Sequence, residues 1–286
     1  MEMLNTNVSN AYNVLGYGGK ILYIIFFVVF FIVVGIPDQI TYILGLRSNK
    51  KQFNLKRITT SPVVFVGEYA MPTAYSNCVV IKGKDGKLLI RSPPQPLPHI
   101  VARIKEEGDV GVIIVSSAHD TYADKWKELF PSAVVIGPKA DIPLLNDRVQ
   151  VDYAAEDADE ILSNYHIVKR MAITSFSRYE DHIYLIQLES GKIVASLSCG
   201  FSNVPFSFHN PFHWRYMIPG TGVKINRLYG LVFVKSHANL RAFWQELAQI
   251  PGLIGLIFLH GETIMNESLP EILLRSHPGR EFQVLG

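Results

Sequence analysis

The chain has 286 residues, of which 48% are hydrophobic and 18% are charged, and this composition excludes an intrinsically disordered protein. Its 27 basic and 25 acidic residues alternate along most of the sequence and leave a net charge of +2, so no broad basic face is available and nucleic acid is not expected as a partner. The two cysteines, Cys78 and Cys199, lie in or beside apolar runs without paired spacing. We expect both to be reduced packing residues.

An uncharged stretch from Ile21 to Ile36 predicts a helix that spans a membrane. At 1.5 Å per residue it covers about 24 Å, and the uncharged residues around it supply the rest of a hydrocarbon core about 30 Å thick. A cleaved signal peptide is disfavoured because no small residues follow, and a core helix is disfavoured because no polar face is present. We therefore expect a transmembrane helix at about 20–37, within an N-terminal segment 1–58.

Basic residues concentrate after this span, between Arg47 and Arg57, whereas only Lys20 is basic before it. The positive-inside bias places the C-terminal bulk of a single-pass protein in the cytosol, or in the matrix or stroma of an organelle. The basic stretch is typical of a juxtamembrane anchor, so membrane lipid is an expected partner of residues 20–46. The organelle is unknown from the sequence, and the mitochondrial inner membrane is kept as a guess.

Residues 59–286 are expected to form one domain of the α/β class, because predicted strands and helices alternate. Turn residues at Asp85-Gly86 and Ser190-Gly191 predict two β-hairpins, over Ser76–Pro93 and over His182–Leu197. The stretch from Ile142 to Glu160 is expected to be a loop with a short edge strand in it. Other expected helices are Leu97–Glu107, Tyr122–Phe130 and Ala238–Gln249, and other expected strands are Val110–Val115, Ala133–Ile136, Tyr165–Ile173, Leu228–Lys235 and Leu253–Leu259.

Two of the apolar strands lead directly into histidines. The strand Val110–Val115 is followed by a polar turn with His119 and Asp120, and the strand Leu253–Leu259 is followed by His260-Gly261. Between them lie a Trp-bearing helix at Lys125-Trp126 and the turn Phe130-Pro131-Ser132-Ala133. In this order of hairpins, strands and histidines the chain resembles a divergent branch of the metallo-β-lactamase superfamily. The resemblance implies a four-layer αββα sandwich, here behind one N-terminal transmembrane helix.

The resemblance also implies where metal ligands would lie. The superfamily holds one or two metal ions with a His-x-His-x-Asp-His turn, a later His, an Asp after the second hairpin and a final His. In this chain the turn matches at His119 alone, since Ser117, Thr121 and Tyr122 stand at the other ligand positions. The Asp position falls at Ser198 or Cys199, the final His falls on His260, and the candidates for the later His are His166 and His182.

The matched ligands are thus His119 and His260, with Asp120 and Cys199 as improvised partners. Two imidazoles without a carboxylate hold zinc poorly, because a catalytic zinc site uses three protein ligands and a water. We therefore expect no catalytic residues and no cofactor, with zinc at these four residues as the alternative. A second pair, His209 and His213, is interrupted by Pro211 and is expected to serve loop packing, and Cys199 as a nucleophile is a minor alternative.

These features predict a membrane-anchored protein that is non-catalytic and serves as a structural or accessory subunit of a membrane protein complex. An aromatic loop at Phe201–Tyr216 offers side chains for contact with such partners. The alternative is a metal-dependent hydrolase with an atypical single-metal site, acting on an ester or a lipid-derived substrate. Whether the protein is an enzyme is left open by the sequence, and the depleted ligand set favours a pseudoenzyme.

Overall fold

The computed structural model describes residues 53–70, 75–116, 119–120, 122–178, 180–204, 222–225, 230 and 233–275. Within these residues the strands form two large sheets and one small sheet. The first large sheet has the order β1 (Leu55–Thr60), β2 (Val63–Ala70), β3 (Tyr75–Lys82), β4 (Leu88–Arg91), β5 (Val110–Ile114), β6 (Val134–Gly137) and β7 (Tyr153–Ala154). Its strands are antiparallel from β1 to β4 and parallel from β4 to β7.

The second large sheet follows later in the chain. Its order is β15 (Ile264–Met265), β13 (Leu253–Ile257), β10 (Ile193–Ser196), β9 (His182–Gln187) and β8 (Ile167–Ala172). The small sheet has the order β12 (Lys224–Ile225), β11 (Phe201–Asn203) and β14 (His260–Gly261). The α-helices are α4 (Pro98–Lys105), α5 (Ala123–Leu129), α6 (Ile142–Leu145), α7 (Asp159–Asn164), α10 (His237–Ala248) and α11 (Leu269–Arg275).

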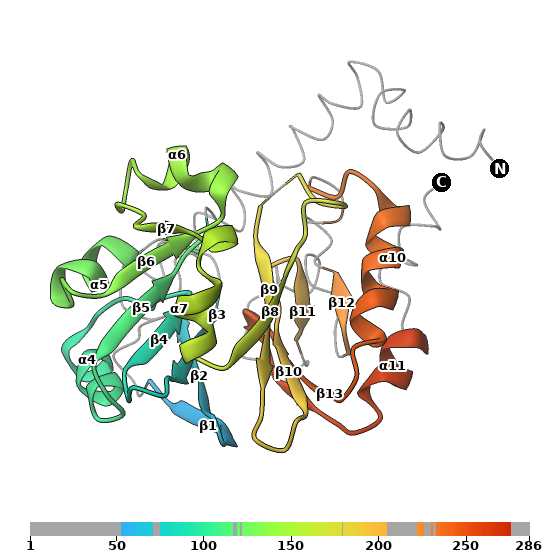
Figure 1. The fold of residues 1–286 in the computed structure, drawn as a ribbon, viewed down its shortest axis with the longest axis horizontal. Helices are drawn as coiled ribbons and strands as arrows, with labels where there is room; N and C mark the ends of the chain where they lie inside the picture. Colours follow the sequence, from blue (N-terminus) through green and yellow to red (C-terminus); the bar gives the residue numbers. More distant parts are fainter. Residues whose placement is uncertain are drawn as a thin grey trace, which may run out of the picture.

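Three apolar cores separate four layers. One core lies between the two large sheets and takes residues such as Val79 and Ile114 from the first and Ile186 from the second. A second core joins the outer face of the first sheet to α4 and α5, and a third joins the second sheet to α10 and α11. Figure 1 shows these helix pairs on opposite sides of the molecule. The layers are therefore helix, sheet, sheet and helix, as the predicted αββα arrangement requires.

The strand sequences explain this burial. In β3 and β4, neighbouring residues alternate between the inner and the outer core, so Val79 and Leu89 face the second sheet while Val80 and Ile90 face the helices. A sheet covered on both faces needs apolar residues at successive positions, which accounts for the continuous run Leu88–Ile90. Trp126 anchors α5 in the outer core and donates from its indole nitrogen to the carbonyl of Pro94 at 2.6 Å.

Both predicted hairpins are confirmed, as are the helices at α4, α5 and α10 and the strands β5, β6, β8 and β13. The loop expected from Ile142 to Glu160 was wrong in part, because it contains α6 and the start of α7, each too short to show helical periodicity. The edge strand, expected at Val149–Tyr153, is the two-residue β7, which begins at the last residue of that range. Of the described residues in the expected strand Leu228–Lys235, only Val234 makes a β-bridge, to Ser177.

The folded domain begins earlier than the expected residue 59, since β1 starts at Leu55. Lys56 and Arg57, assigned to the basic juxtamembrane stretch, belong to this strand, and the guanidinium carbon of Arg57 lies 5.4 Å from the centre of the Phe65 ring. No helix in the described part of the chain is long and apolar enough to cross a bilayer. The predicted span at 20–37 lies outside the described residues.

The turn that carries His260 is held from the first sheet by Asn77. The side-chain amide of Asn77 donates to the carbonyls of Phe258 and Gly261 at 2.8 and 2.6 Å, and its backbone N–H donates to Leu259 at 2.8 Å. Gly261 has φ +104, and a Cβ there would lie 2.0 Å from the carbonyl oxygen of Asn203. The turn therefore needs both an amide at residue 77 and a glycine at residue 261.

We expect Asn77→Ala to destabilise the domain by about 2 kcal/mol or more, because each buried polar group left without a partner costs about 1–3 kcal/mol. Chemical denaturation of the full chain followed by circular dichroism measures the change. Gln245→Ala, which removes an exposed amide on α10, serves as the matched control and should change the free energy of unfolding by less than about 0.5 kcal/mol. Equal losses in the two variants would contradict the anchoring role of Asn77.

Candidate functional site

The predicted meeting of the two histidines is confirmed. His119 follows β5 and His260 lies in β14, and their ring centres are 5.4 Å apart with the planes tilted by 45°. The edge that carries them also carries the end of β10, because β10 and β13 run parallel and reach the same side of the sheet. Polar turns from both large sheets therefore gather at one edge of the sandwich.

His119 is buried and belongs to a chain of hydrogen bonds. Its Nδ1 lies 2.9 Å from the hydroxyl oxygen of Ser92, which lies 2.9 Å from the hydroxyl oxygen of Tyr69. Burial lowers the pKa of His119 well below its ordinary value, and the charges of His260 and Arg91 lower it further. The ring is therefore neutral, which is the form that binds metals. Its Nδ1 is already engaged, so only Nε2 is free of this hydrogen-bond chain.

Asp120, the first improvised ligand, is bound to a cation of the protein itself. Both of its carboxylate oxygens lie 2.9 Å from a guanidinium nitrogen of Arg148. The side chain of Asp120 is 4% exposed and that of Arg148 is 60% exposed, so the pair lies at the surface of the sandwich. Burial raises the pKa of Asp120, and Arg148 opposes that rise. The carboxylate thus fastens the turn to the segment after α6.

Cys199, the second improvised ligand, is a free cysteine beside the inner core. Burial raises the pKa of its thiol far above the ordinary range, and the nearby carboxylate of Asp181 raises it further. A thiol must lose its proton before it can bind a metal or attack a carbonyl. Without a metal ion the thiol of Cys199 is therefore protonated at neutral pH, as is that of the buried Cys78.

The two candidates for the later ligand lie at opposite ends of a strand pair. His182 begins β9, and its Nε2 lies 3.4 Å from a carboxylate oxygen of Glu156. His166 precedes β8, and its carbonyl accepts from the N–H of Gln187 at the far end of β9. Across all residues that the structure describes, no three His, Cys, Asp or Glu side chains are grouped so that they could hold a metal ion. The residues at this edge do not fit the metal centre that the resemblance implies.

Sequence reasoning missed the charged group at the centre of this edge, Arg91. Its guanidinium donates to the carbonyl and the hydroxyl of Ser196, both at 2.8 Å, to the carbonyl of His182 at 2.8 Å, and to both carboxylate oxygens of Asp181 at 3.2 Å. It also lies 4.9 Å from the centre of the Tyr184 ring. The one signal in the sequence is an arginine that ends the apolar run Leu88–Ile90.

The carboxylate of Asp181 and the guanidinium of Arg91 form an ion pair with side chains 3% and 5% exposed. Burial raises the pKa of Asp181, while Arg91 and the backbone N–H of His182 lower it. A buried ion pair is favourable only when further hydrogen bonds satisfy both partners. Here three oxygens of Ser196 and His182 accept from Arg91, and the backbone N–H of His182 donates to Asp181 at 2.7 Å. The pair therefore links the two large sheets, and its hydrogen bonds replace the water that would solvate these charges at the surface.

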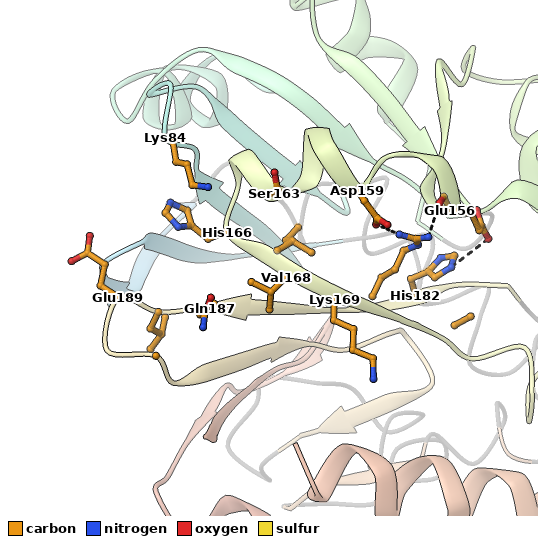
Figure 2. A pocket seen from close by; sticks show the side chains of 15 residues that line it. Lys84, Glu156, Asp159, Ser163, His166, Val168, Lys169, His182, Gln187 and Glu189 are labelled. Atoms are coloured by element: carbon orange, nitrogen blue, oxygen red, sulfur yellow. Dashed lines mark hydrogen bonds and ion pairs between the residues drawn. The ribbon is translucent and has the colours of Figure 1, made fainter. Parts of the chain in front are cut away.

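A groove of about 1010 Å³ runs along β8. His166 and His182 line it, whereas His119 and His260 do not. Figure 2 shows Lys84, His166 and Glu189 toward one end of it and Glu156, Asp159 and His182 toward the other. Arg170 bonds the side chain of Asp159 and the carbonyl of Glu156, so much of the charge in the groove is paired internally. Its lining combines both signs of charge and selects no class of ligand.

Two large facing sheets covered by helices, with histidines after β5 and β13 at one edge, form the four-layer αββα arrangement that the resemblance implies. No family model and no curated protein matches the chain. Among solved structures, DIM-1 metallo-β-lactamase exposed to ceftazidime is 13% identical, with 78% of this chain and 94% of that chain covered and a TM-score of 0.46. A second DIM-1 structure is 12% identical over 78% and 95% of the two chains, with a TM-score of 0.46.

A metallo-β-lactamase from Pontibacter korlensis is 10% identical over 79% of this chain and 100% of that chain, with a TM-score of 0.43. All three TM-scores lie below 0.5. The activity, substrate and metal content of those enzymes are therefore not carried over to this chain. What this chain does has to be inferred from its own residues.

The neutral buried His119 makes stability depend on pH. Between its ordinary pKa of 6.5 and its lowered pKa in the folded state, the unfolded chain binds one more proton, so the free energy of unfolding falls as the pH falls. We expect a loss of up to about 1.4 kcal/mol per pH unit below about pH 6.5, and a plateau above it. His119→Gln removes this part of the slope and leaves the parts due to His166, His182 and His237, whose pKa values burial also lowers. Urea denaturation across this pH range measures it, and an unchanged slope in the variant would refute the assignment.

Proposed function

We propose that the protein is a non-catalytic metallo-β-lactamase-like protein, anchored in a membrane by residues 20–37, and that it serves as a structural or accessory subunit of a membrane protein complex. The non-catalytic part of the proposal rests on the candidate ligands other than the two histidines. Asp120 is bound by Arg148, and no three His, Cys, Asp or Glu side chains of the described residues are grouped so that they could hold a metal ion. Two imidazoles are then left where hydrolysis needs at least three ligands and an activated water.

The membrane part of the proposal rests on the uncharged stretch and the basic residues that follow it. An anchor of this kind holds the domain beside a bilayer, on the cytosolic, matrix or stromal side. A domain without a catalytic centre acts there through the contacts that it makes, so other subunits of a membrane complex are the proposed partners. The mitochondrial inner membrane stays one candidate location among several.

A second candidate function is a hydrolase with a single-metal site that acts on an ester or a lipid-derived substrate. The retained proximity of His119 and His260, with ring centres 5.4 Å apart, favours it. In that case zinc would be held by these two residues, with a third ligand still to be identified. Zinc would supply the activation of a bound water, and the histidines would hold it as neutral imidazoles.

Metal analysis of the full chain, purified in detergent, separates the two candidates. We expect substoichiometric zinc, iron and manganese, and no hydrolysis of 4-nitrophenyl butyrate or 4-nitrophenyl laurate above buffer, because the ligand set is incomplete. His119→Ala should change neither readout. A stoichiometric metal that is lost in His119→Ala, together with ester hydrolysis lost in the same variant, would establish the hydrolase instead.

Extraction of membranes tests the anchor. We expect the full chain to stay in the membrane pellet at alkaline pH, and a variant with Phe27→Lys and Phe31→Lys to move to the supernatant, because each lysine at the centre of a span costs about 2.5–3.5 kcal/mol. A matched variant, Phe27→Leu and Phe31→Leu, should stay in the pellet. In mild detergent the wild type should migrate on a native gel in an assembly larger than its 32.1 kDa chain. Release of the wild type at alkaline pH would contradict the anchor, and migration as a monomer would contradict the subunit role.

A further inference from the structure

Arg91 lies at the edge of the sandwich where a metal would bind in this fold. It is the last residue of β4, the parallel neighbour of β5, so it leaves the first sheet on the side from which the His119 turn starts. Its partners come from the second sheet, where Asp181 directly precedes β9 and Ser196 ends β10. The guanidinium thus bridges the two sheets beside the candidate ligands.

The hydrogen-bond acceptors around the guanidinium of Arg91 are all oxygen atoms. Two carbonyls, one hydroxyl and one carboxylate, from Ser196, His182 and Asp181, accept from the guanidinium at 2.8 to 3.2 Å. Carbonyl and carboxylate oxygens are also the groups that divalent cations bind. The negative and polar surroundings that would attract a metal ion at this edge are already used by a cation that belongs to the chain.

The charge on Arg91 is permanent, because a guanidinium does not lose its proton in proteins. The side chain is 5% exposed, so water screens it little. It lies next to the candidate ligands, since Arg91 pairs with Ile114 of β5 and the following residue, Ser92, has its hydroxyl oxygen 2.9 Å from Nδ1 of His119. A divalent cation at His119 and His260 would meet this fixed positive charge in a medium of low dielectric constant, where repulsion is strong.

We propose that Arg91 replaces the metal ion of the fold: it ties the two sheets together at this edge and keeps divalent cations off His119 and His260. This inference rests on the proposed function, in which the domain works without a metal. It adds that Arg91 is the residue that holds the two sheets together without a metal ion. It also assigns the loss of metal binding to a positive charge as well as to missing ligands.

The test compares Arg91→Met, which removes the charge at similar side-chain length, with Arg91→Lys, which keeps the charge. The full chain is purified in detergent and titrated with Co²⁺, followed by its visible absorption, and with Zn²⁺ by equilibrium dialysis. We expect Arg91→Met to bind both ions about tenfold or more tightly than the wild type, and Arg91→Lys to resemble the wild type. Adding His119→Ala and His260→Ala to Arg91→Met should abolish the gain.

Thermal unfolding in the same samples tests the structural half of the proposal. Arg91→Met should melt at a lower temperature than the wild type, and Zn²⁺ should raise its melting temperature while leaving the wild type unchanged. If Arg91→Met does not fold, Arg91→Met with Asp181→Asn removes both buried charges, and its Co²⁺ affinity is compared with that of Asp181→Asn alone. The proposal predicts a gain in the double variant here too.

The outcomes separate this inference from the proposed function. A wild type that is free of metal, together with a folded Arg91→Met that gains no Co²⁺ affinity, overturns the inference alone. An equal gain in Arg91→Lys also overturns it, because the charge is then not the cause. Stoichiometric metal on His119 in the wild type, with ester hydrolysis, overturns the proposed function.

Discussion

The ion pair between Arg91 and Asp181 sets the geometry of the edge on which His119 and His260 lie. Its two members are 90 residues apart and belong to different sheets, and both are almost fully buried. A buried charge that loses its partner costs about 3–5 kcal/mol, so the two sheets cannot slide or separate at this edge without that cost. Ser92 follows Arg91 directly and bonds His119, so the position of that histidine is also set from this point.

The sequence predicted most elements but not the group that organises the site. The hairpins were predictable because their turns contain Gly86 and Gly191, both at positive φ, between apolar strands. Strands β1 and β2 were missed because Lys56 and Arg57 were interpreted as a lipid anchor, although charges also suit an edge strand. The histidines after β5 and β13 were found because each follows an apolar run. Arg91 could not be paired with Asp181, since that contact depends on how two separate sheets face each other.

The fold alone does not identify the function, whereas the side chains at the site limit what chemistry is possible. A fold of this class supports many activities, so function has to be argued from the chemistry of the site. At this site a carboxylate is bound by an arginine, and burial keeps the imidazole of His119 neutral by lowering its pKa. These two contacts at the turn after β5 are what support the proposed non-catalytic role of the domain.

Gly261 shows how the backbone alone can place His260 at this edge. The turn around it is fixed by the backbone of Asn203, which leaves no space for a Cβ, and by the amide of Asn77. These constraints concern packing alone and act whether or not a metal was ever bound. The backbone path that brings residue 260 toward His119 is thus preserved by the core beneath it. The proximity of the two histidines is thus a consequence of backbone packing and does not need a bound metal to maintain it.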